Sequence, residues 1–148
     1  MRLGLVLLGI LISADIAYAD EESLDPEVHK IAMNNISMEY VTCASYYAHA
    51  AMAVKNGGDQ KTSDSYSNIY ENVIVLAVAA AQLGRSQEMA MKVTTARLDI
   101  VMDEMQSEIE NDYSNFSLLM QKYHQRCDFV VNNTEKFMDE WFDEARSK

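Results

Sequence analysis

A histidine and a cysteine stand three residues apart in the stretch KYHQRC, at His124 and Cys127. Three kinds of chemistry fit such a pair: half of a metal site, half of a catalytic pair, or one end of a disulfide. A Cys/His zinc site normally has two close pairs of ligands, and this sequence offers one. His49 follows Cys43 by six positions, which places the two side chains about 120° apart around a helix. We therefore expect no metal site here.

The start of the chain indicates the compartment, and the compartment decides between the remaining possibilities. One basic residue, Arg2, precedes an apolar run from Leu3 to Ile12, and a polar stretch then ends in Ala17-Tyr18-Ala19. This pattern is typical of a secretory signal peptide, residues 1–19, of the bacterial type. The run is too short to span a bilayer, which needs about 20 apolar residues. We expect an exported protein, periplasmic or secreted, with no stable membrane insertion after cleavage.

An oxidising compartment favours pairing of the two cysteines, Cys43 and Cys127. Each cysteine lies on an apolar stripe of a predicted helix, so both sulfur atoms should point inward. A bridge between them would close a loop of about 84 residues, which the chain-entropy model converts to roughly 4 to 5 kcal/mol of stability. We predict this disulfide. A soft-metal site or two unrelated buried thiols are the alternatives.

The elements that carry these residues are predicted to be helices, because the chain has only five glycines and one proline. Apolar side chains recur every three or four residues from Asp25, the expected N-cap, to Asn56. A polar loop should follow up to about Ser65, and a second helix should run from there to Leu83. Its centre, VIVLAVAAA, is apolar all round and is predicted to be the most buried element.

A third helical segment should begin after Ser86, which can cap it. The spacing of apolar residues by three or four is almost uninterrupted across residues 110–115. One long helix and two helices with a bend at Asn111 to Asn115 are therefore both possible. A final amphipathic helix follows residues 132–134. The sequence therefore predicts an all-α bundle of about four to five helices with one inter-helix disulfide. It forms a single domain over residues 20–148, in which 20–24 are expected to be mobile.

The chain is acidic, with a formal net charge of −11. Such a charge disfavours nucleic acid and anionic membranes as partners, and it attracts basic proteins by long-range steering. It is also a common means of staying soluble. Carboxylates are densest on the third helical segment, where their spacing of three to four residues predicts a negatively charged ridge. The ridge is either a hydrated outer face or a docking surface for a basic partner. The ridge consists of Asp99, Asp103, Glu104 and Glu108.

No catalytic constellation is assembled by the sequence, since His124 and Asp128 are the only candidates and no nucleophile lies beside them. The ten methionines fit core packing better than copper(I) binding, because Met89 and Met91 point about 200° apart on a helix. We expect neither enzymatic activity nor a cofactor. The expected function is a non-catalytic interaction factor, such as an inhibitor, immunity or accessory protein, for a basic partner. The alternative is a periplasmic helical carrier of a small apolar ligand or a soft metal ion.

Overall fold

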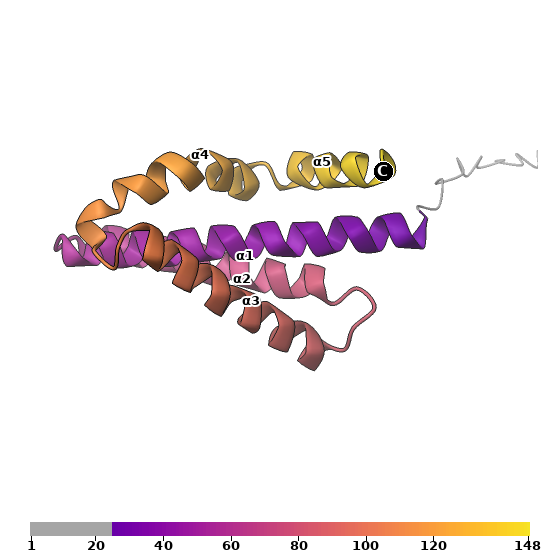
Figure 1. Cartoon of the computed structure of the whole chain (residues 1–148), viewed down its shortest axis with the longest axis horizontal. Coiled ribbons are helices and arrows are strands. Elements are labelled where there is room, and N and C mark those ends of the chain that lie inside the picture. Colours follow the sequence, from indigo (N-terminus) through magenta and orange to yellow (C-terminus); the bar gives the residue numbers. More distant parts are fainter. Residues whose placement is uncertain (1–24) are drawn as a thin grey trace, which may run out of the picture.

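The computed structural model describes residues 25–148, which fold into five α-helices and one short 3-10 helix (Figure 1). The predicted all-α bundle is confirmed for this part of the chain. The predictions made for residues 1–19 and 20–24 lie outside the described residues. In chain order the elements are α1 (Pro26–Asn56), α2 (Gln60–Ala81), α3 (Gln87–Glu108), η1 (Tyr113–Asn115), α4 (Ser117–Asn132) and α5 (Thr134–Arg146).

Helix α1 forms the axis of the bundle. It begins as the sequence predicted: the Asp25 carboxylate accepts a hydrogen bond from the backbone N–H of Glu27 at 2.8 Å, and Pro26 occupies the first turn. Helices α2 and α3 pack on one side of α1, and α4 and α5 lie along the opposite side (Figure 1). Residues 43–47 are consequently all buried. A helix with a single apolar stripe would leave some of these five positions in water.

The prediction that the second helix would be the most buried element was wrong. Helix α2 covers α1 with one face only, through a row of buried small residues that includes Ala77 and Ala80. Val73 of its apolar centre is buried with these alanines, but Val75 and Leu76 point outward and are 65% and 40% exposed. Small alanines permit close approach of two helices, so contact with α1 selects the alanine face.

The polar loop before α2 is also shorter than predicted. Helix α2 begins at Gln60 instead of about Ser65, because Asp59 caps it and accepts a hydrogen bond from the backbone N–H of Thr62 at 3.0 Å. Only residues 57–59 join the first two helices. Gly58, at a φ of +89°, supplies the left-handed backbone that this tight connection requires.

The third helical segment is divided into two helices. Helix α3 ends at Glu108, and the two residues Glu110 and Asn111 adopt positive φ values of 54° and 58°. The 3-10 helix η1 then turns the chain back toward α1, and α4 starts at Ser117. The bend therefore lies close to the position that the sequence allowed for it.

The predicted disulfide is confirmed, and it joins α1 to α4. The Cα atoms of Cys43 and Cys127 lie 5.1 Å apart, which is an ordinary separation for a bridged pair. Close by, Arg126 donates hydrogen bonds to Glu39 of α1 and to Glu140 of α5, each at 2.8 Å. Covalent and ionic contacts thus hold α4 and α5 against α1 at one level of the bundle.

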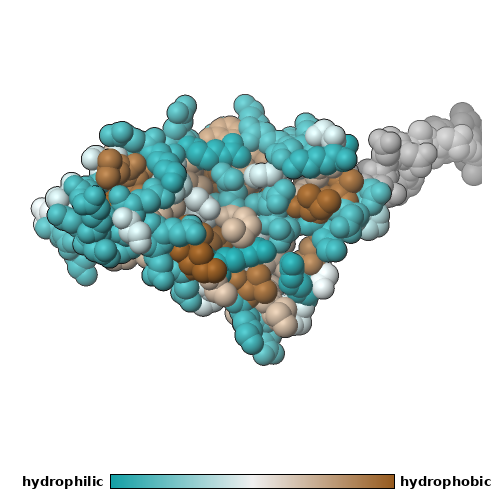
Figure 2. All heavy atoms as spheres, in the orientation of Figure 1, coloured by the Kyte–Doolittle hydropathy of each residue, from teal (hydrophilic) through white to brown (hydrophobic). Residues whose placement is uncertain are grey.

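The outer surface is mainly hydrophilic, with separated apolar areas on the face that Figure 2 shows. Within residues 25–148, no helix has the length and the apolar character that crossing a bilayer demands.

Candidate functional site

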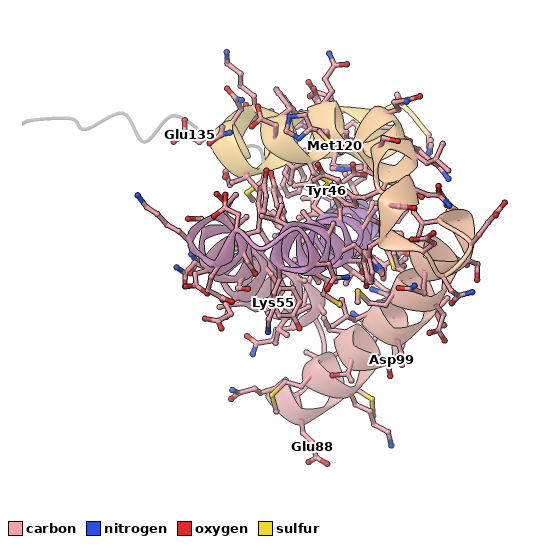
Figure 3. All side chains as sticks on the ribbon, turned by 90° about the vertical axis from the view of Figure 1, so that its left-hand side faces the viewer. Tyr46, Lys55, Glu88, Asp99, Met120 and Glu135 are labelled. Atoms are coloured by element: carbon pink, nitrogen blue, oxygen red, sulfur yellow. A yellow bond between two sulfur atoms is a disulfide. The ribbon has the colours of Figure 1, made fainter. Side chains whose placement is uncertain are left out.

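The predicted acidic ridge lies on α3, the helix that leans away from the rest of the bundle. Figure 3 shows this arrangement, with Glu88 near the outer end of α3 and Asp99 further along it. The helix starts as predicted, because the Ser86 hydroxyl accepts a hydrogen bond from the backbone N–H of Met89 at 3.3 Å. Its tilt leaves most of its surface in water: its buried residues are Ala90, Thr94 and Met105.

Three of the four ridge carboxylates have no cationic partner within residues 25–148. Asp99, Asp103 and Glu104 are exposed, and none of them forms an ion pair with a lysine, arginine or histidine of the described chain. Ile100 stands beside them and is 59% exposed. The surface therefore combines uncompensated negative charge with one large apolar side chain.

Glu108 behaves differently from the rest of the ridge. Its carboxylate accepts hydrogen bonds from Lys122 Nζ at 2.7 Å and from the Tyr123 hydroxyl at 2.8 Å, so it joins α3 to α4. Partial burial alone would raise the pKa of Glu108, but these two hydrogen bonds outweigh burial and lower that pKa below its usual value. Glu108 has an internal role in the fold and is less available to a partner than the other ridge residues.

The histidine next to the disulfide does not pair with the aspartate that the sequence suggested. His124 Nδ1 lies 3.2 Å from the hydroxyl of Tyr46, while Asp128 accepts a hydrogen bond from Asn132 at 2.9 Å. Tyr46 is only 1% exposed, and burial raises its pKa above the usual value. Tyr46 and His124 therefore share a hydrogen bond between α1 and α4, and which of the two donates depends on the imidazole tautomer.

His49 is the second polar residue whose position the sequence did not reveal. It is 1% exposed, with Nε2 at 3.2 Å from the carbonyl oxygen of Met102 and Nδ1 at 3.1 Å from the Tyr113 hydroxyl. Burial lowers the pKa of its imidazole. Tyr46 and His49 are three residues apart and so share a face of α1. The spacing places both side chains on one face, but it does not show that a further helix covers that face.

The described residues contain no group of three or more histidine, cysteine, aspartate or glutamate side chains that could hold a metal ion. Both cysteine sulfurs are engaged in the disulfide.

Comparison with known proteins adds no family to this description. A scan against protein-family models finds no match, and searches of curated proteins and of solved structures also return none.

Proposed function

We propose that this protein is an exported, non-catalytic interaction factor that binds a basic partner through the acidic ridge of α3. The proposal is carried by one observation: Asp99, Asp103 and Glu104 are exposed on a single helix, and no cation of residues 25–148 neutralises them. Carboxylates at helical spacing repel one another, and cationic side chains of a partner would relieve that repulsion.

Two further features support the proposal. Ile100 offers an apolar contact between the charged positions, and interfaces commonly combine an apolar centre with a polar rim. The Cys43–Cys127 bridge is the kind of cross-link that persists in oxidising compartments, which supports export to the periplasm or the medium. The net charge of −11 would steer a basic protein toward this surface over long range.

Charge reversal on the ridge tests the proposal. The variant carries Asp99→Lys, Asp103→Lys and Glu104→Lys, and leaves Glu108 in place because that residue holds α3 to α4. Immobilised parent protein should capture a basic protein from the native envelope fraction and release it at moderate ionic strength, since salt screens exposed charges. The ridge variant should lose this protein.

A matched control separates the ridge from the overall charge. Glu71, Glu135 and Asp139 are exposed on α2 and α5, so reversing these three to lysine changes the net charge by the same amount. The control variant should still capture the partner. Equal retention by both variants, or equal loss in both, would show that the ridge is not the contact.

A further inference from the structure

A hollow at one end of the bundle differs in charge from the rest of this acidic chain. It lies between the start of α1 and the turn that joins α2 to α3, two segments found at the same end of the molecule in Figure 1. Its volume of about 440 Å³ is in the range of small-molecule sites. The described residues that line it are Pro26, His29, Lys30, Leu83, Gly84 and Arg85.

The ionisable groups of this hollow are basic, and they are poorly neutralised. Arg85 donates one hydrogen bond, from Nη1 to the carbonyl oxygen of Ala81 at 3.0 Å, and forms no ion pair with any carboxylate between residues 25 and 148. Lys30 has Glu27 at 3.5 Å, but both side chains are about two-thirds exposed, and such surface pairs contribute little. Among the described residues, the remaining guanidinium donors of Arg85 have no carboxylate partner, so they can bind an anion.

A second arginine adds to the positive charge near the hollow. Arg97 of α3 is half-buried and donates to neutral oxygens, those of Asn34 at 2.8 Å and Ser37 at 3.5 Å. Burial, and then the like charge of Arg85, lower the pKa of Arg97. Two guanidinium groups thus repel each other in a chain whose net charge is −11. An anion bound at Arg85 would relieve this repulsion.

The same hollow has apolar walls. Leu83 is 37% exposed at its edge, and Pro26 and the aliphatic stem of Lys30 extend the apolar surface. Gly84 has a φ of +69°, and a Cβ added there would meet no atom within 4 Å, so the turn leaves open space at the hollow. A wall of this kind gives no advantage to a fully hydrated ion such as sulfate, but it suits an anion with a short hydrocarbon chain.

We propose that this hollow binds a small amphiphilic carboxylate, with its carboxylate between Arg85 and Lys30 and its alkyl chain over Leu83 and Pro26. The planar guanidinium can hold a carboxylate through two parallel hydrogen bonds, and the lysine adds a point charge. This site is separate from the acidic ridge. Its ligand also differs from the small apolar ligand or soft metal ion of the alternative carrier function.

The experiment uses decanoate as the probe, kept below its micelle concentration, in a calorimetric titration of the oxidised protein at low ionic strength. Decanoate should bind, whereas decan-1-ol and acetate should bind at least about tenfold more weakly, because each lacks one half of the recognised chemistry. Backbone amide signals of Gly84 and Arg85 should shift during the titration. Vesicles of phosphatidylglycerol form a separate arm, since an anionic lipid surface offers a similar head and chain.

Two variants and a control make the proposal decisive. Arg85→Gln should weaken decanoate binding by at least about tenfold, and Lys30→Gln serves the same purpose if the first variant does not fold. Lys92→Gln removes the same charge from an exposed position of α3 outside the hollow, and should change affinity by less than about twofold. Decanol binding as tightly as decanoate, amide shifts centred elsewhere, binding to vesicles alone, or unchanged affinity in Arg85→Gln would each overturn the proposal.

Discussion

His49 shows at the residue scale how burial fixes the state of an ionisable group. The carbonyl oxygen of Met102 can only accept a hydrogen bond, so Nε2 of His49 must carry the proton. Nδ1 then faces the Tyr113 hydroxyl, 3.1 Å away, which can donate its one proton to Nδ1 or to Gln106 Oε1 at 3.0 Å. This neutral tautomer has a polar neighbour at each ring nitrogen, at a point where α1, α3 and η1 meet. A second proton would leave a charge in a site with 1% exposure.

This geometry predicts a loss of stability at mildly acidic pH. Burial lowers the folded-state pKa of His49 below its ordinary value of 6.5, so the unfolded chain binds more protons below about pH 6.5. Above about pH 7, the titration of His49 should therefore leave the free energy of unfolding unchanged. That free energy should fall as pH drops below 6.5, by at most about 1.4 kcal/mol per pH unit. Urea unfolding between pH 7.5 and 5, followed by circular dichroism, measures this loss.

Two substitutions assign the effect to one histidine. His49→Gln can keep hydrogen bonds on both sides of the ring position but cannot titrate, so the loss between pH 7 and pH 5 should become smaller. His124→Gln changes an exposed histidine and should leave the loss unchanged. If His49→Gln shows the same pH dependence as the parent protein, the buried imidazole is not its source.

The pairing of the two cysteines was predictable from the sequence. The burial of residues that contact a third helix was not. Cys43 and Cys127 lie on apolar stripes and pair as predicted. Tyr46 and His49 are buried because α4 and η1 close over a side of α1 that a two-helix contact would leave open. No local pattern of α1 specifies how many neighbours that helix receives.

The same limit operates at the scale of whole elements. The apolar centre of α2 predicted complete burial, yet close contact with α1 selects its alanines and leaves Val75 and Leu76 exposed. A helix centre that is apolar all round has no apolar stripe, so its sequence does not show which face is covered. The position of the acidic ridge on an outer helix was predictable, because its carboxylates are arranged at helical spacing. The ion pair that Glu108 forms with Lys122 was not predictable, because it depends on how α4 lies against α3.

The end of α3 explains why the sequence left one helix or two undecided. The backbone N–H of Asn111 donates to the Gln106 carbonyl at 3.0 Å, and the N–H of Glu110 donates to the Ser107 carbonyl at 3.0 Å. These two bonds form a Schellman motif, whose left-handed residue is usually glycine. Here that residue is Glu110, with a φ of 54°. The usual sequence signal for a helix end is therefore missing.

Replacing Glu110 by glycine should stabilise the protein. A left-handed conformation costs a non-glycine residue about 1 to 2 kcal/mol, and glycine removes this cost. Part of the gain is lost, because glycine increases the conformational entropy of the unfolded chain. We expect Glu110→Gly to raise the free energy of unfolding by about 0.5 to 1 kcal/mol in urea. The matched control is Glu104→Gly, the same change inside α3, which should lower it by a similar amount. Destabilisation by both would contradict the assignment of strain to Glu110.

At the scale of the whole molecule, positive and negative charges are unevenly distributed over the surface. The chain has a net charge of −11, yet its described cations are uneven: Lys122 and Arg126 are paired with carboxylates, while Arg85 and Arg97 near the hollow are not. The ridge and the hollow therefore present opposite charges on one protein. Both features lie on the surface, where they leave the packing of α1 undisturbed.

The net charge predicts how salt changes the free energy of unfolding, and the direction of that change distinguishes two effects of salt. Sodium chloride screens both the long-range repulsion among carboxylates, which destabilises the fold, and the exposed ion pairs, which stabilise it slightly. Because the negative charges are in large excess, repulsion should dominate. Raising the salt concentration from about 0.01 to 0.3 M should increase the free energy of unfolding by roughly 1 kcal/mol. Urea is the suitable denaturant, because it adds no ions of its own.

The ridge variant with Asp99→Lys, Asp103→Lys and Glu104→Lys offers a check within the same experiment. Its net negative charge is about half that of the parent, so its gain in stability with salt should be clearly smaller. A parent protein that becomes less stable as salt is added would mean that local ion pairs, such as those of Arg126 with Glu39 and Glu140, outweigh the repulsion. In that case the excess of carboxylates would influence the encounter with a partner without affecting the stability of the fold.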